Sequence, residues 1–151
     1  MSAIKINPDI LPKNINIHYP GSKNYNELPG YISGWDIALI PFAINESTKF
    51  ISPTKTPEYL AAGKPVISTA IEDVVHPYGD EHLVHIIHSA EEFIKAATEE
   101  LNNSKTEWLK KADAFLAGNS WNTTWQKMFD IINSALNSKQ TYKHKKTKAY
   151  V

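Results

Sequence analysis

Apolar and polar positions along the chain alternate between two periods, one typical of strands and one typical of helices. Four segments have the length and composition of strands: residues 14–19, 37–42, 65–69 and 83–87. The second is an unbroken apolar run, IALIPF, which is the pattern of a central strand covered on both faces of a parallel sheet. The first alternates, with Ile15 and Ile17 on one face, and a Pro-Gly turn follows it.

Helical spacing and capping residues predict five helices around these strands, beginning at Asn24, Thr56, Ser89, Ser104 and Ser120. Asn24, Ser89 and Ser104 are each followed three residues later by a glutamate, which is the spacing of a capping box. Thr56 precedes a proline and an acidic residue, so we expect it to cap a short helix that ends at Gly63. This alternation predicts an α/β fold, a partial Rossmann-like parallel sheet of about four strands with flanking helices.

The last predicted helix carries one broad apolar stripe and stops near Ser138. The stripe consists of Trp121, Trp125, Met128, Phe129, Ile132 and Leu136. Its helical spacing favours burial in the core, whereas exposure of the stripe would favour docking onto a neighbouring domain. Residues 139–151 hold five lysines and no acid, which predicts a disordered tail or linker after a domain of residues 1–138.

The expected sheet lacks one feature of a complete doubly wound fold. Such a fold usually begins with a strand and a glycine-rich turn that holds phosphate, and residues 1–12 provide neither. We therefore expect a domain that is incomplete at its N-terminal side.

Charge and composition narrow the class of protein. The 16 basic residues are all lysines and balance 16 acids over 151 residues, so we expect no nucleic-acid partner. Without arginine, a bound phosphate would rely on lysines and backbone amides. No apolar stretch approaches the roughly 20 residues of a membrane-spanning helix, so no membrane insertion is expected. The absence of cysteine agrees with a cytoplasmic location.

The candidate binding site follows the second predicted strand. Ligands of open parallel sheets bind beyond the carboxyl ends of the strands, which directs attention to residues 43–58. The helix start at Thr56 offers unpaired amides, and Lys49 and Lys55 add positive charge, a combination suited to a diphosphate. Glu58 in the first turn can accept hydrogen bonds from ribose hydroxyls, but acids are also common there because they offset the helix dipole.

A continuous motif connects this site to a known family. The run SPTKTPEYLAAGKPVIST at residues 52–69, preceded by WDIALIPF at residues 35–42, resembles the C-terminal domain of group 1 retaining GT-B glycosyltransferases. The resemblance covers residues 14–97, and the Trp-rich last helix is also similar. It implies that the chain is the half of such an enzyme that binds the donor, a nucleoside-diphosphate sugar.

The resemblance also implies roles for individual residues. Glu58 matches the second glutamate of the family's paired-glutamate motif, which binds the ribose hydroxyls of the donor. Ser52, Thr54 and Lys55 match the stretch that faces the diphosphate, and Thr56 belongs to the same expected donor site. The family transfers a sugar to an acceptor hydroxyl, here in polysaccharide or cell-envelope glycan synthesis. Many of its members need no divalent metal, so neither a metal nor a cofactor is expected.

Two departures from the family pattern bear on activity. The first glutamate of the motif should lie eight positions before Glu58, and that residue is Phe50. Asn45 and Glu46 are weak substitutes for it. The N-terminal acceptor domain of the family is missing from the sequence. We therefore expect weakened donor binding, no catalytic residue in this chain and no turnover by the chain alone.

Two alternatives remain open from the sequence. The chain could be a non-catalytic glycosyltransferase-like module of a larger sugar-nucleotide protein, such as a fusion to UDP-galactopyranose mutase, and Phe50 favours that interpretation. The histidines at positions 76, 82, 85 and 88 suggest a metal site, but they match no ligand motif and are expected to be polar residues at strand ends.

Overall fold

The computed structural model describes the backbone of residues 7–148 and the side chains of residue 7 and residues 9–138. The described chain is α/β, as predicted, with three strands: β1 (Ala38–Ile40), β2 (Val66–Thr69) and β3 (Val84–Ile87). The α-helices are α1 (Leu28–Ser33), α2 (Lys55–Ala61), α3 (Glu72–Val74), α4 (Ala90–Asn102), α5 (Thr106–Ala117) and α6 (Trp121–Lys148). Shorter helical turns are η1 (Pro8–Ile10), η2 (Tyr25–Glu27) and η3 (Val75–Gly79).

The three strands form one parallel sheet in the order β1-β2-β3. Ala38 pairs with Val66, and Val66 pairs with Val84, so these three residues lie on the same face of the sheet. A parallel sheet connected through helices is the arrangement of a Rossmann-like fold.

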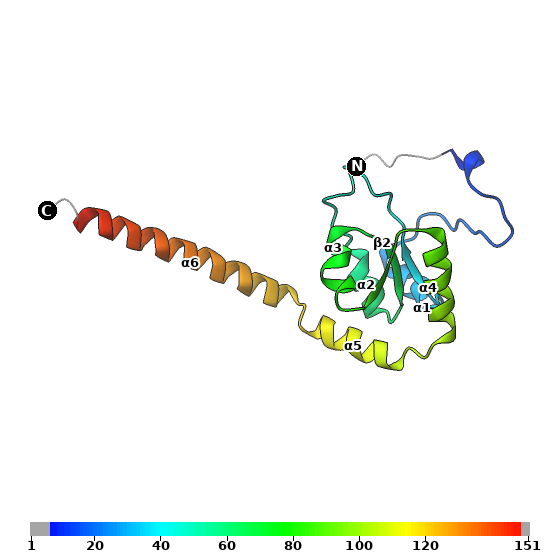
Figure 1. Cartoon of the computed structure of the whole chain (residues 1–151). Coiled ribbons are helices and arrows are strands. Elements are labelled where there is room, and N and C mark those ends of the chain that lie inside the picture. The colour runs from blue at the N-terminus through cyan, green and yellow to red at the C-terminus, as the bar shows by residue number, and fades with distance from the viewer. Residues whose placement is uncertain (1–6, 149–151) are drawn as a thin grey trace.

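Helices cover both faces of the sheet to different extents (Figure 1). The face of Val66 packs with Leu60 of α2, Val74 of α3 and Ala112 of α5, all of which are buried. On the other face, the His85 Nε2 atom of β3 lies 2.7 Å from the Glu100 Oε1 atom of α4. The core therefore lies mainly between the sheet and helices α2, α3 and α5.

The first predicted strand is wrong, and its absence changes the position of the second. Residues 14–17 form a turn in which the Ile17 amide donates to the Asn14 carbonyl over 2.9 Å, residues 17–19 are irregular, and Ile15 is 96% exposed. The alternating pattern there is too short and too polar to form a strand without a neighbour that covers its apolar face. Consequently β1 is an edge strand with Leu39 exposed, not the predicted central strand, and the described sheet has three strands instead of about four.

The turn between α2 and β2 fixes two elements at once. Gly63 has a φ of +68°, a conformation that favours glycine after a helix, as predicted from its position. Beside it, the Lys64 Nζ atom donates hydrogen bonds to the carbonyl oxygens of Ser33 (2.9 Å) and Trp35 (2.8 Å) at the end of α1. Lys64 therefore links the end of α1 to the segment that leads into β2.

The predicted helix starts are confirmed in part. The Glu27 carboxylate accepts from the Asn24 amide over 2.9 Å, and the Ser89 hydroxyl accepts from the Glu92 amide over 3.2 Å. Ser104 is not the N-cap of α5, because that position is taken by Lys105 in a helical conformation. The Ser104 hydroxyl is instead 3.5 Å from the Thr106 amide, too far for a strong cap.

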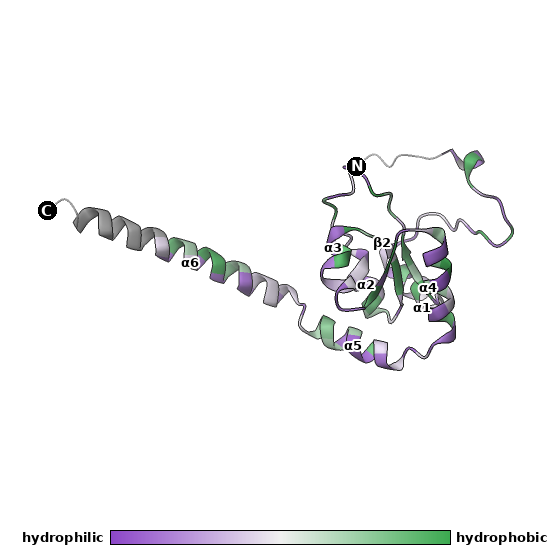
Figure 2. Ribbon diagram, in the orientation of Figure 1, coloured by the Kyte–Doolittle hydropathy of each residue, from purple (hydrophilic) through white to green (hydrophobic). Residues whose placement is uncertain are grey.

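The last helix differs most from its prediction. It continues to Lys148, ten residues beyond the expected end at Ser138, because residues 139–148 contain no glycine or proline and are rich in lysine, a good helix former. Figure 1 shows α6 extending away from the sheet, and Figure 2 shows hydrophobic residues along its first half. The stripe is thus exposed and not part of the core, with Trp121 90% exposed. Residues 149–151 of the predicted tail lie outside the described residues.

Candidate functional site

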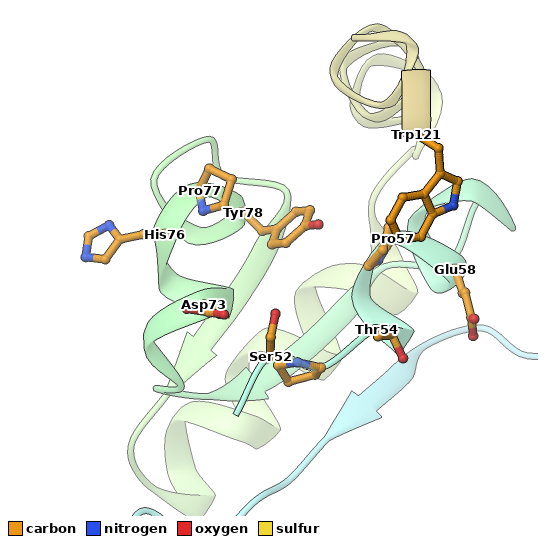
Figure 3. A pocket seen from close by; sticks show the side chains of 10 residues that line it. Ser52, Thr54, Pro57, Glu58, Asp73, His76, Pro77, Tyr78 and Trp121 are labelled. Atoms are coloured by element: carbon orange, nitrogen blue, oxygen red, sulfur yellow. The ribbon is translucent and has the colours of Figure 1, made fainter. Parts of the chain in front are cut away.

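A cleft of about 520 Å³ lies beside the start of α2 (Figure 3). Its walls come from three parts of the chain: the segment that leads from β1 into α2, the segment that follows β2, and the start of α6. The lining residues are Ser52, Pro53, Thr54, Pro57, Glu58, Asp73, His76, Pro77, Tyr78 and Trp121. Two of the three segments follow the carboxyl ends of parallel strands, which is where ligands of such sheets bind.

The start of α2 differs by two residues from its prediction. The helix begins at Lys55 with Thr54 in the N-cap position, and the Thr54 side chain makes no capping hydrogen bond. Pro57 is therefore the third helical residue, where its missing N–H costs little because the first amides of a helix have no partner within it. The Thr56 amide donates to the Pro53 carbonyl over 3.3 Å, so it is not free to bind a ligand.

Glu58 and Thr54 form the polar part of the α2 wall. Figure 3 shows the Glu58 carboxylate and the Thr54 hydroxyl pointing to the same side, away from the Tyr78 ring. Glu58 also lines a second, mostly apolar cleft of about 300 Å³ between η2, α1 and α2. Glu58 thus lines two neighbouring clefts, and its side chain is exposed.

The opposite wall follows β2 and carries a histidine and a tyrosine. The His76 Nδ1 atom lies 2.5 Å from the Asp80 Oδ2 atom, and this hydrogen bond, together with the negative charge of Asp80, raises the pKa of His76. Burial raises the pKa of Tyr78, whose ring packs 5.5 Å from that of Phe115 in α5. Tyr78 therefore offers the cleft a neutral hydroxyl on a ring that is fixed from behind.

The two residues expected to substitute weakly for the first glutamate of the family motif lie outside the cleft beside α2. Asn45 and Glu46 line a separate cleft of about 370 Å³, together with Thr48, Lys49 and Glu72 among others. The Asn45 Oδ1 atom accepts hydrogen bonds from the amides of Ser47 (2.9 Å) and Thr48 (3.2 Å), so this side chain stabilises its own turn.

The remaining predicted site residues are not gathered in the cleft. Lys55 is exposed and lines neither the cleft beside α2 nor that around Asn45. Thr56 is fully buried, and its hydroxyl finds no hydrogen-bond partner among the described residues. Phe50, which the resemblance aligns with the family's first glutamate, is 85% exposed, and the Lys49 Nζ atom lies 5.5 Å from its ring centre. Of the seven predicted donor-binding residues, the cleft contains Ser52, Thr54 and Glu58.

Sequence reasoning missed the far wall of the cleft, although one signal was available. Ligands of open parallel sheets bind beyond the carboxyl end of any strand, so the segment after β2 was as good a candidate as the segment after β1. The segment after β2 contains Asp73, His76 and Tyr78. Trp121 gave no such signal, because its place beside Pro57 depends on how α6 leaves the end of α5.

No three His, Cys, Asp or Glu side chains within the described part of the chain gather in a way that could hold a metal ion. None of the helices in that part combines the length and the apolar character needed to cross a membrane.

Comparisons with known proteins give no family assignment. No family model matches the chain, and neither a curated protein nor a solved structure matches it. What supports a function is therefore the resemblance of residues 52–69 and the geometry of the cleft around Glu58.

Proposed function

We propose that this chain is the donor-binding domain of a cytoplasmic GT-B-type glycosyltransferase and that it is inactive alone. The substrate is a nucleoside-diphosphate sugar, and the setting is polysaccharide or cell-envelope glycan synthesis. One observation carries the proposal: Ser52, Thr54 and Glu58, which the resemblance assigns to the donor, line one cleft together with residues of the segment that follows β2. The acceptor would be bound by a second domain, as in the family.

The chemistry of the cleft suits the polar parts of such a donor. The Glu58 carboxylate has two oxygens that can accept hydrogen bonds from the two hydroxyls of a ribose. The Ser52 and Thr54 hydroxyls can donate to phosphate oxygens, and Lys55 follows Thr54 directly in the first turn of α2. The volume of about 520 Å³ falls in the range of small-molecule sites, roughly 300 to 1,000 Å³.

In this proposal the domain assists transfer without a nucleophile of its own. Negative charge develops on the leaving diphosphate as the glycosidic bond to it breaks, and fixed dipoles and cations stabilise that charge. Lys55 is the cation nearest in sequence to the cleft-lining hydroxyls, but it is exposed and lies outside the cleft lining, so its contribution is screened by solvent. The α2 helix is short, so its dipole adds only a modest contribution.

A second candidate function is favoured by the surroundings of Phe50. This residue replaces an acid of the family motif and is largely exposed, and Glu46 lies in a different cleft from Glu58. A glycosyltransferase-like module that has lost donor chemistry, and that serves as a binding unit of a larger sugar-nucleotide protein such as a fusion to UDP-galactopyranose mutase, would have these features.

Calorimetric titration of the folded chain separates the two functions. UDP, GDP and UDP-sugars are each titrated into the chain, with inorganic phosphate as the control for a purely electrostatic contribution. The donor-binding proposal predicts weak saturable binding of at least one nucleotide, and no release of free sugar from the UDP-sugar on incubation. A folded chain that binds none of the nucleotides would overturn the proposal and favour the non-catalytic module.

A further inference from the structure

The apolar stripe of α6 is largely exposed in the described chain. The large side chains of the stripe are between 44% and 90% exposed, and Ile131 beside it is 70% exposed. Figures 1 and 2 show this half of α6 projecting from the domain, with no helix or strand of the described chain packed along it. Helices in proteins owe most of their stability to packing of such a face, so an unpacked α6 would be only marginally stable.

The spacing of the stripe is that of a helix that pairs with another helix. Trp121, Trp125, Met128 and Ile132 are separated by four, three and four residues, which keeps them on one seam. Phe129 flanks this seam by one position and widens it, as does Leu136.

The exposed area is sufficient for a stable interface. Three aromatic side chains, at 150–250 Å² each when fully buried, and four aliphatic ones together expose on the order of 800 Å². This is about the area that each partner contributes to a standard protein–protein interface. The stripe therefore exceeds what scattered surface hydrophobics would explain.

We propose that α6 pairs with α6 of a second copy of this chain, in antiparallel orientation. Lys127 and Asp130 are the only charged residues between positions 121 and 138, and their charges cancel. Two copies of this segment can therefore approach without net repulsion. The five lysines after Ser138 select the orientation, because a parallel pair would place two such segments side by side. An antiparallel pair centred between Met128 and Phe129 places the two lysine-rich segments at opposite ends. It also sets Trp125 opposite Ile132 of the second copy.

Sedimentation equilibrium of the full chain over a wide range of concentration tests the pairing. We expect a mass twice that of one chain at high concentration, and a loss of the dimer in Trp125→Glu and in Ile132→Glu. Both residues are at least half exposed in the single chain, so both variants should keep the unfolding midpoint that the unchanged chain has when it is dilute enough to be monomeric. Ser134→Glu, on the outer face of the same helix, is the matched control and should remain dimeric.

Orientation is tested by disulfide formation, since the chain has no cysteine of its own. In an antiparallel pair, Met128→Cys lies near the twofold axis and should join two copies, whereas Ile132→Cys, which faces Trp125 of the second copy, should not. A parallel pair would join both variants and would overturn the orientation. A chain that is monomeric at every concentration, with α6 still helical, would overturn the pairing and show that something other than a second copy covers the stripe. Donor binding is not required for either result.

Discussion

Glu58 of α2 and Trp121 of α6 line the same cleft, although one follows the first strand and the other begins the last helix. The carboxylate stands at one rim, and the indole lies above Pro57 (Figure 3). The wall that carries Glu58 belongs to the stable core, because Leu60 two residues later is buried against the sheet. The Trp121 wall belongs to a helix whose apolar stripe is largely exposed, so the two walls differ in rigidity.

Glu58→Gln should weaken nucleotide binding without unfolding the domain. The substitution keeps the size of the side chain but removes the charge that strengthens hydrogen bonds from ribose hydroxyls, a contribution of about 1.5 kcal/mol. We expect the dissociation constant measured by calorimetry to rise about tenfold. Glu91→Gln, also an exposed acid in the first turn of a helix, is the control and should bind as the unchanged chain does. Equal binding by the two variants would remove Glu58 from the site.

Thr56→Val should stabilise the domain and leave binding intact. The Thr56 hydroxyl is buried without a partner among the described residues, so replacing it with a methyl group removes the cost of an unsatisfied polar group. We expect the free energy of unfolding in urea to rise by about 1 kcal/mol. Thr54→Val, at an exposed position, should leave it unchanged. A destabilised Thr56→Val would mean that this hydroxyl is hydrogen-bonded.

Leu60→Ala should destabilise the domain strongly. Leu60 is 1% exposed and packs between α2 and the sheet, so truncation leaves a cavity at the centre of the core. The expected loss of unfolding free energy is about 2–5 kcal/mol. Leu101→Ala is the same substitution at a 61% exposed position of α4 and should cost about 0.5 kcal/mol or less. Similar losses from both would show that α2 does not pack as described.

The titration of His76 should depend on Asp80. Their hydrogen bond raises the pKa of His76 above the ordinary value of 6.5, so the protonated form is favoured in the folded chain. The stabilisation is therefore fully present below about pH 6.5 and is lost as the pH rises through the raised pKa. Asp80→Asn should lower the pKa of His76 when it is followed by NMR, and by more than Glu72→Gln does. A pKa that is unchanged in Asp80→Asn would contradict the pairing.

The parts of the fold that the sequence predicted are those set by local chemistry. The apolar run that contains Ile40, the left-handed Gly63 and the Ser89 cap each act within a few residues, and the structure has them where they were expected. The strand predicted over residues 14–19 was wrong because a strand needs a neighbouring strand, and a local sequence pattern does not show whether one is present. Thr56 was predicted to cap α2, but the helix begins two residues earlier. This shift puts Thr56 inside the helix at a buried position.

The candidate site was predictable to a similar degree. Ser52, Thr54 and Glu58 lie close in sequence and share one helix start, so they reach the same cleft together. Tyr78 and Trp121 join them through the arrangement of distant segments, which the sequence pattern does not specify.

The most direct test of the donor site is an NMR titration of the isotopically labelled chain with UDP. The account predicts that the largest shifts of amide resonances fall on the non-proline residues of 52–58, with smaller ones at Tyr78 and at the indole of Trp121. Their concentration dependence should give a single dissociation constant, and Glu58→Gln should weaken it. Shifts confined to the lysine-rich end of α6, or none at all in a folded chain, would contradict a nucleotide site at the start of α2.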